Sequence, residues 1–177
     1  MIQDNSREIE LINLFNLSPN DQRDGLDATY NLNGKIYPIE LKSTTTNSIT
    51  TSRDVNLNHT RKWKEKIWII GVYDKSSETL KYCQILPPNI LHTWITNLEM
   101  KIRDLENTAR WVEEVISRDG EKDGEMVSGI RRILKRGITI NNPKIPLKLF
   151  KDTWKIYQDH TVFLNSFIQS YQPLTHV

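Results

Sequence analysis

Residues Ile67–Tyr73 form a continuous apolar run, IWIIGVY, in which no polar residue alternates with the apolar ones. Such a run, rich in β-branched side chains, is typical of a strand that is buried on both faces of a sheet. A strand of this kind needs other elements packed against each of its faces. The run therefore predicts a layered fold in which helices flank a central sheet.

Two further extended runs, Leu26–Leu32 and Lys35–Lys42, are separated by the dipeptide Asn33-Gly34. This dipeptide favours positive backbone φ and is a strong indication of a two-residue turn between antiparallel strands. We therefore expect a β-hairpin early in the chain.

The remaining pattern predicts one α/β or α+β domain around a central mixed β-sheet flanked by helices. Within this single domain of residues 1–177, we expect an N-terminal helix and candidate dimer contact at 1–22, a catalytic core at 23–86, a helical region at 87–136, and a recognition strand with C-terminal helices at 137–177. The expected elements are a helix at 5–17, a loop or irregular strand at 44–51, a helix capped by Asn58 or Thr60 and running to Lys66, a strand at 79–86, a long helix broken near 120–124 and resumed at 126–135, a strand at 138–140, and a helical tail after Phe150.

Composition limits the classes of protein to which the chain can belong. The length of 177 residues and the hydrophobic fraction of 37% fit one globular domain. The single cysteine, Cys83, excludes an internal disulfide framework, and we interpret it as a small strand residue. The polar start of the chain, Met1–Glu10, has no secretory character and no apolar run is long enough for a membrane span, so we expect a cytoplasmic protein without a membrane partner. The net charge of +2 does not by itself identify a nucleic-acid-binding protein.

Three residues of the predicted hairpin carry the chemistry. Alternation along a strand puts Glu40 and Lys42 on one face and Leu41 on the other. Counted back from the turn, Asp27 on the preceding strand lies near enough to Glu40 for the two carboxylates to converge. Two carboxylates suit the oxygen coordination of Mg²⁺, and the backbone carbonyl of Leu41 adds a candidate ligand. Lys42 would orient the attacking water or stabilise a charged transition state. Asp24 is a candidate for a second metal position.

A Glu-x-Lys triplet alone is weak evidence, because Glu99-Met100-Lys101 is another one in a predicted helix. The plain alternative for the first triplet is a set of surface charges on an exposed strand. The strand context, the preceding Gly-x-Asp and the intervening hairpin support a metal site, but the pattern alone leaves both interpretations open.

The pattern Asp27…Glu40-x-Lys42 resembles the PD-(D/E)xK nuclease superfamily. Within it, the chain resembles the PvuII-type restriction endonucleases in three blocks, which occur in the expected order. These blocks are Arg23–Ala28 leading to Glu40–Ser43, then Trp68–Tyr73 with the preceding 56–66 segment, and Ile140–Lys148.

The resemblance implies a type II restriction endonuclease that hydrolyses double-stranded DNA by a metal-activated water. It implies Mg²⁺ as the cofactor, with Mn²⁺ as a substitute and Ca²⁺ supporting binding without cleavage. It also implies a homodimer on a palindromic site, together with a cognate DNA methyltransferase in the same system.

The resemblance also places base recognition at Arg53 and Asp54 and at Asn141 and Asn142. Arginine pairs with guanine and aspartate accepts from cytosine, so we expect a short G/C-rich palindrome such as GC-N-GC. Histidines are expected at the first position in the most similar family member, so Arg53-Asp54 indicates a different target. The structural alternatives are a salt-bridged turn and an Asx-turn before proline. Candidates for DNA backbone contacts are Lys62, Lys64 and Lys144.

Two other functions stay open at this point. A structure-selective repair nuclease or junction resolvase would use the same metal site and cut branched DNA without reading bases. A sequence-reading DNA-binding protein would bind without cleavage.

Overall fold

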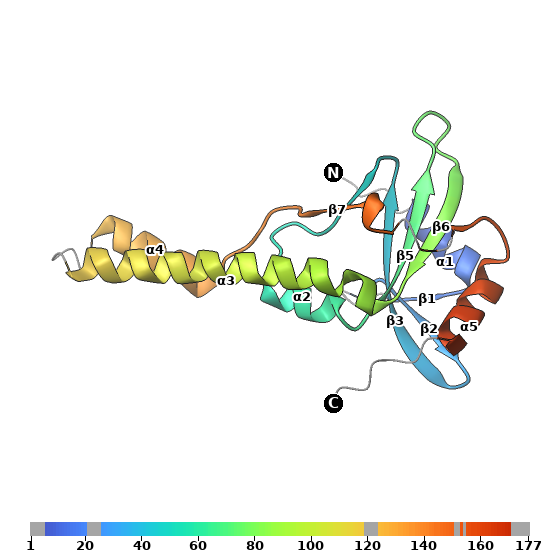
Figure 1. Cartoon of the computed structure of the whole chain (residues 1–177), viewed down its shortest axis with the longest axis horizontal. Coiled ribbons are helices and arrows are strands. Elements are labelled where there is room, and N and C mark those ends of the chain that lie inside the picture. The colour runs from blue at the N-terminus through green and yellow to red at the C-terminus, as the bar shows by residue number, and fades with distance from the viewer. Residues whose placement is uncertain (1–5, 21–25, 119–123, 151–152, 154, 171–177) are drawn as a thin grey trace.

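The computed structural model describes residues 6–20, 26–118, 124–150, 153 and 155–170. Figure 1 shows a sheet-centred body from which a long helical arm projects. The described elements are α1 (Ser6–Phe15), β1 (Ser18–Pro19), β2 (Ala28–Leu32), β3 (Lys35–Thr44), β4 (Ser48–Thr50), α2 (Leu57–Trp63), β5 (Ile67–Tyr73), β6 (Leu80–Leu86), α3 (Pro88–Arg118), α4 (Glu125–Arg136), β7 (Lys144–Pro146), the 3₁₀ helix η1 (Leu147–Phe150), β8 (Lys155–Ile156) and α5 (His160–Ser170).

The main sheet is mixed and, in the described residues, has six strands in the order β1-β2-β3-β5-β6-β8. Its pairs are antiparallel except for β3 and β5, which run parallel. β4 and β7 form a separate two-stranded antiparallel sheet. The predicted α/β class and the mixed central sheet are confirmed.

Strand β5 is buried along its whole length, as its apolar sequence predicts. Ile69 faces a core formed with α1 and α5, whereas Trp68 and Ile70 face a second core formed with α2 and α3. Each face is sealed by helices, because a sheet that is apolar on both faces needs a packing layer on each side. At Gly71 an added Cβ would lie 2.8 Å from the Tyr73 ring and 3.1 Å from Leu11, so this glycine allows α1 to pack closely on β5.

The predicted hairpin is present. Leu32 pairs with Lys35, and the two turn residues Asn33 and Gly34 have φ of 54° and 82°. The Gly34 amide donates to the Asn31 side chain at 3.0 Å. The turn residues thus fix the register of β2 and β3.

Helix α2 begins one turn earlier than expected from Thr60. Asn56 is its N-cap, and its side chain accepts hydrogen bonds from the amides of Asn58 and His59. The prediction of Asn58 or Thr60 as the cap is wrong, because Asn56 accepts from the first-turn amides while Thr60 lies inside the helix. The helix ends at Trp63 rather than at Lys66.

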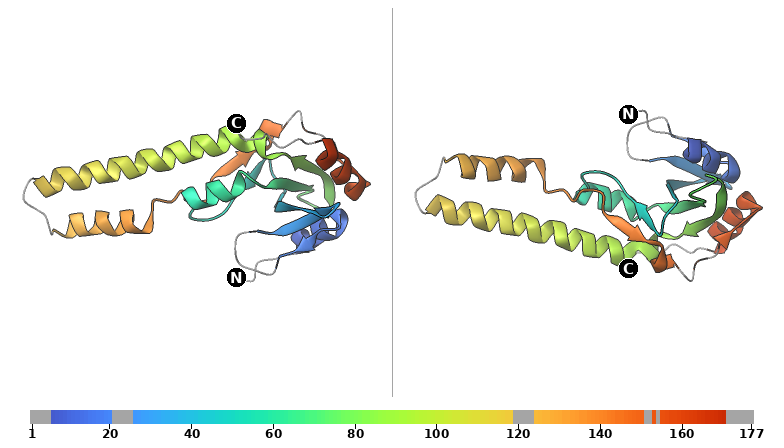
Figure 2. Two further views of the ribbon diagram at one scale, coloured as in Figure 1. Left: turned by 90° about the horizontal axis from the view of Figure 1, so that it is seen from below. Right: turned by 90° about the horizontal axis from the view of Figure 1, so that it is seen from above.

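The helical arm consists of the outer part of α3 together with α4. Helix α4 runs back alongside α3 (Figure 2). The fully buried residues of α3 all lie in its first half: Leu91, Ile95, Leu98 and Ile102. Beyond Ile102, α3 leaves the body of the molecule and packs on α4, where Val127 is buried. The expected break near 120–124 falls mainly on residues outside the described ranges.

Two predictions for the C-terminal part are wrong. The expected strand at 138–140 is reduced to a single bridge between Ile140 and Val55. The tail after Phe150 contains β8 before its helix begins at His160. No helix among the described residues is both long and apolar enough to cross a membrane.

Candidate active site

The hairpin brings Asp27 next to Glu40. In the register of β2 and β3, Ala28 pairs with Ile39, so the preceding residue, Asp27, faces Glu40. The Asp27 carboxylate accepts a hydrogen bond from the Leu41 amide at 2.8 Å. The carboxylate of Asp27 is therefore fixed to the strand that carries Glu40.

Lys42 lies at the centre of this cluster. Its ammonium is 2.7 Å from Glu40 Oε1, 2.9 Å from the Leu41 carbonyl oxygen and 3.5 Å from Asp27 Oδ2. Leu41 itself turns its side chain into the opposite core, as alternation along the strand requires. The structure thus brings together the three predicted side chains and the predicted backbone carbonyl.

A second lysine, Lys66, completes the cluster and was not predicted as a site residue. Its ammonium forms an ion pair with Glu40 Oε2, and both side chains are about 95% buried, with exposed fractions of 5% and 4%. The parallel pairing of β3 with β5 sets Glu40 beside Trp68, and Lys66 lies just before this strand. In the sequence, Lys66 follows Arg61, Lys62 and Lys64 in a basic run of the kind that usually forms a solvated face. Its burial, with 4% of the residue exposed, departs from that pattern.

The charges in the cluster balance one another, because the carboxylates of Asp27 and Glu40 face the ammonium groups of Lys42 and Lys66. Burial raises the pKa of Asp27, the Lys42 ammonium opposes this rise and the Glu40 carboxylate adds to it, so the net direction is upward. Burial lowers the pKa of Lys42, but Glu40 and Asp27 raise it by more, which keeps the ammonium charged.

Glu8, in the first turn of α1, is a third carboxylate near the cluster. Burial raises its pKa above the ordinary value, and the negative charge of Asp27 adds to this rise. An acidic side chain is common in the first turn of a helix, so the place of Glu8 in the sequence does not mark it as a site residue. Its proximity to Asp27 depends on the packing of α1 against the sheet, which no local pattern reveals.

The oxygen atoms of the cluster fit a small divalent cation. Among the residues that the structure describes, no group of three or more His, Cys, Asp or Glu side chains is arranged to hold a metal ion. Asp27 Oδ2, Glu40 Oε1 and the Leu41 carbonyl nevertheless converge on one point, now taken by the Lys42 ammonium. Mg²⁺ is commonly held by one or two carboxylates, with water and substrate phosphate as its other ligands, so these oxygens suffice. Asp24 lies outside the described residues.

The two segments predicted to contact bases lie side by side, although they are far apart in the chain. Val55 and Ile140 exchange backbone hydrogen bonds of 2.9 and 2.8 Å, and β4 pairs with β7. Asp54 and Asn142, close to this bridge, have φ of 51° and 44°, in the left-handed region, and both lie at bends of the chain. Three of the residues predicted to contact bases are exposed, namely Arg53, Asp54 and Asn141. The fourth, Asn142, is half-buried.

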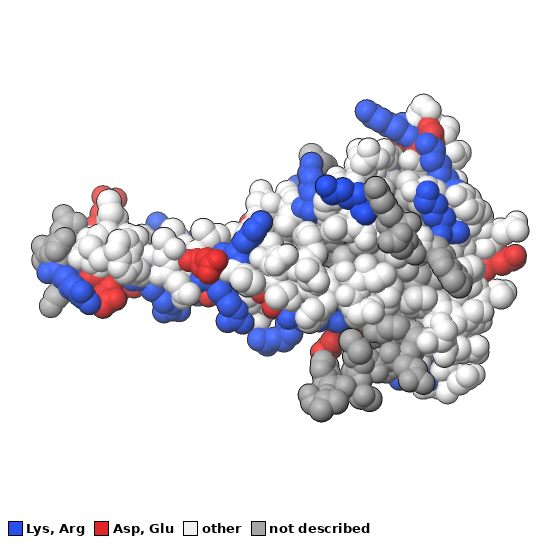
Figure 3. Space-filling model, viewed as in Figure 1, with Lys and Arg blue, Asp and Glu red and all other residues white. Residues whose placement is uncertain are grey.

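The predicted backbone-contacting lysines differ in their surroundings. Lys62 and Lys144 are exposed, whereas Lys64 is half-buried and forms an ion pair of 2.8 Å with Glu99. On the face drawn in Figure 3, the Lys and Arg side chains are spread over the body and along the arm, with acidic residues among them. On this face, surface charge therefore does not by itself mark a nucleic-acid-binding region.

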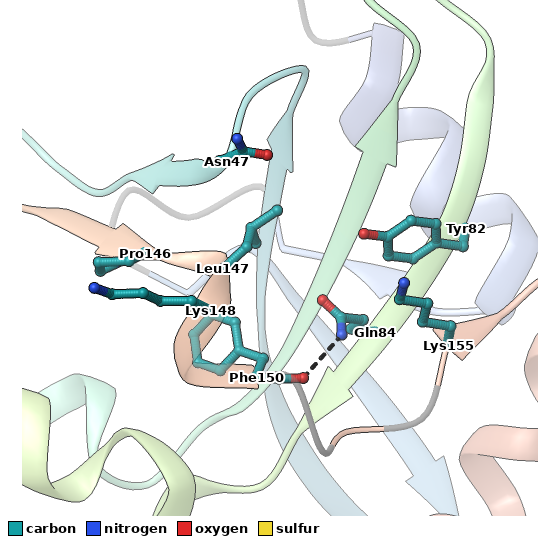
Figure 4. Close-up of a pocket in the computed structure, with 8 residues that line it drawn as sticks. All are labelled: Asn47, Tyr82, Gln84, Pro146, Leu147, Lys148, Phe150 and Lys155. Atoms are coloured by element: carbon teal, nitrogen blue, oxygen red, sulfur yellow. Dashed lines mark hydrogen bonds between the residues drawn. The ribbon is translucent and has the colours of Figure 1, made fainter.

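A separate pocket lies on the same face of the sheet, over β6 (Figure 4). Tyr82, Gln84, Lys148 and Lys155 contribute to its lining, and the Gln84 amide donates to the Phe150 carbonyl at 3.3 Å. The pocket contains neither carboxylate of the cluster, so it is not part of the candidate active site.

The chain matches no model of a known protein family, and no curated protein matches it. The interpretation of the site therefore depends on its geometry and on the motif.

Proposed function

We propose that this chain is a magnesium-dependent DNA endonuclease of the type II restriction class, with a PD-(D/E)xK fold. The observation that carries the proposal is the convergence of Asp27, Glu40 and the Leu41 carbonyl on the Lys42 ammonium, at a point that is partly buried. Buried carboxylates that share a site are costly to fold and are characteristic of functional sites.

In this proposal Asp27, Glu40 and the Leu41 carbonyl hold the ion. When bound, Mg²⁺ would activate a water and neutralise charge on the attacked phosphate. The hydrogen bond from the Leu41 amide keeps Asp27 in place, and Lys66 keeps Glu40 in place. Lys42 supplies a positive charge beside the phosphate as negative charge develops on it.

The adjacency of the segments that contain Arg53-Asp54 and Asn141-Asn142 supports base recognition rather than recognition of DNA shape alone. We propose that the two segments read a short G/C-rich palindrome. A homodimer would then place one active site on each strand, since the symmetry of protein and target should correspond. In such a system a methyltransferase would protect the host sites.

The test is incubation of the purified protein with unmethylated phage DNA and Mg²⁺. Discrete bands that disappear with EDTA, and that a Lys42→Ala variant does not produce, would support the proposal, and their ends would give the target sequence. Cleavage of branched DNA alone would favour a structure-selective nuclease. Binding to DNA in Ca²⁺ with no cleavage in Mg²⁺ or Mn²⁺ would favour a non-catalytic DNA-binding protein.

A further inference from the structure

The Lys42 ammonium lies at the point where the three candidate metal-binding oxygens converge. It is within 3.5 Å of Asp27 Oδ2, Glu40 Oε1 and the Leu41 carbonyl oxygen. A single cation fills such a point, because a second positive charge at the same distances would be repelled by the first. An ammonium and a divalent cation therefore compete for these oxygens.

Glu40 has a different ammonium on each of its oxygens. Lys42 contacts Oε1, and Lys66 contacts Oε2. If Lys42 moves away, Glu40 still has a charged partner and keeps its orientation. Loss of both partners would leave a buried carboxylate uncompensated, which is strongly unfavourable.

The two lysines differ in their access to solvent. The Lys42 side chain is 18% exposed and its partner Asp27 is 27% exposed, whereas the side chains of Lys66 and Glu40 are nearly completely buried. Lys42 thus lies on the open side of the cluster and Lys66 on the closed side. The flexible stem of lysine allows the Lys42 ammonium to swing outward without movement of the strand.

We infer that a small divalent cation enters this site by exchange with the Lys42 ammonium, while Lys66 stays on Glu40 as a fixed counter-ion and positioning residue. The inference rests on the proposed function, because it takes Asp27, Glu40 and the Leu41 carbonyl as the metal ligands. After the exchange Lys42 faces the open side of the site, which is where a phosphate group would approach.

The first test measures the accessibility of each lysine by acylation and mass spectrometry, with and without Ca²⁺. Acylation of Lys42 should rise severalfold with Ca²⁺, whereas Lys66 should stay protected under both conditions. Lys144, which is exposed and outside the cluster, serves as the internal reference. Ca²⁺ binding that leaves Lys42 as protected as before would overturn the exchange, and exposure of Lys66 would overturn its fixed role.

The second test measures Ca²⁺ affinity by calorimetry for variants that circular dichroism shows to be folded. Lys42→Met removes the competing ammonium and should tighten Ca²⁺ binding about tenfold, within the range typical of coupled binding equilibria. Lys42→Arg retains a competing charge and should not tighten binding. Lys64→Met is the matched control, because it removes a nearby positive charge that is paired with Glu99 rather than with the cluster.

Unchanged or weaker Ca²⁺ binding by Lys42→Met would refute the exchange even if the wild-type protein binds Ca²⁺ and cleaves DNA. Equal tightening by Lys42→Met and Lys64→Met would also refute it, because a general effect of charge would then explain both. If the wild-type protein neither binds divalent cations nor cleaves DNA, the proposed function itself fails, which is a distinguishable result.

Discussion

The hairpin end of the sheet buries charged side chains, whereas the helical arm exposes apolar ones. At the hairpin, Glu40 and Lys66 are charged and almost completely buried. On the arm, Trp111 and Met126 are apolar and more than 60% exposed, with values of 63% and 62%. Ion pairs on the arm, such as Arg131 with Glu113, lie at the surface.

This difference shows where the fold accepts an energetic cost. Burying ion pairs is often neutral or unfavourable for stability compared with apolar packing, so a buried charged cluster is better explained by chemistry than by folding. Exposed apolar side chains on the arm cost little for folding and contribute little to it. The body of the molecule therefore contains the apolar cores that stabilise the fold and also the candidate active site. Residues of α3 beyond Ile102, and those of α4, belong to neither core cluster.

The largest effect is expected at the centre of the cluster. Lys42→Ala should reduce DNA cleavage by at least about a hundredfold, as expected when a charge that stabilises a transition state is lost. Specific DNA binding in Ca²⁺ should persist. The comparison is made with gel-based cleavage and binding assays, with Lys135→Ala on the arm as the control. Cleavage by Lys42→Ala at the wild-type rate would show that the buried cluster is structural.

Breaking a buried ion pair should cost much more stability than breaking an exposed one. Lys66→Met should lower the free energy of unfolding by about 3 kcal/mol. This value is at the low end of the range expected when a buried ion pair is broken, because Glu40 retains its ion pair with Lys42. Arg131→Met on the arm should lower it by less than about 1 kcal/mol. Urea unfolding measures both values. Similar losses would mean that the pairing of Lys66 with Glu40 is less buried than described.

Two apolar residues on the same helix mark the boundary between body and arm. Ile102 is fully buried, whereas Leu105, one turn further along α3, is 48% exposed. Ile102→Ala should cost about 2–5 kcal/mol, because it leaves a cavity in the core. Leu105→Ala should cost less than about 1 kcal/mol. Thermal or urea unfolding tests the pair, and a large loss for Leu105→Ala would place the boundary further out along the arm.

The smallest effect is a pH dependence at His160, where α5 begins. Burial lowers the pKa of His160 below the ordinary value of 6.5, and Phe15 packs against its ring with 5.1 Å between centroids. The unfolded chain therefore binds the proton more readily, so the His160 contribution to stability is present above about pH 6.5 and is lost as the pH falls. His160→Phe should reduce the fall in melting temperature between pH 7.5 and 5.5. An unchanged pH dependence in this variant would assign the fall to other groups.

The sequence predicted the part of the site that lies on the β2–β3 hairpin, because this part depends only on residues close together in the chain. The Asn33-Gly34 turn fixes the register of β2 and β3, and this register alone brings Asp27 to Glu40. Alternation then assigns Glu40 and Lys42 to one face. Because each step uses neighbouring residues or a short turn, the sequence was sufficient to predict it.

The features that the sequence did not predict are of two kinds. Some depend on contacts between residues far apart in the chain, and others on a choice among several residues with the same local preference. Lys66 reaches Glu40 through parallel strand pairing, and Glu8 reaches the cluster through helix packing, neither of which leaves a local pattern. Asn56, Asn58 and Thr60 all favour a helix N-cap, so this local preference does not choose among them, and the structure uses Asn56. The run at 138–140 has strand-forming residues but forms only one bridge, because β4 and β7 supply the extended pairing in that region.

The bridge between Val55 and Ile140 also sets an order of assembly. Asp27 and Glu40 meet when a short hairpin closes, whereas Val55 meets Ile140 only after the whole arm has been synthesised. Contacts between residues that are distant in the chain form more slowly than local contacts. A chain that ends before Ile140 also lacks the residues that the last elements add to both cores, such as Ile145, Phe150 and Leu164. Under the proposed function, the cutting site and the recognition segments would therefore become complete together, once the C-terminal elements have packed onto the sheet.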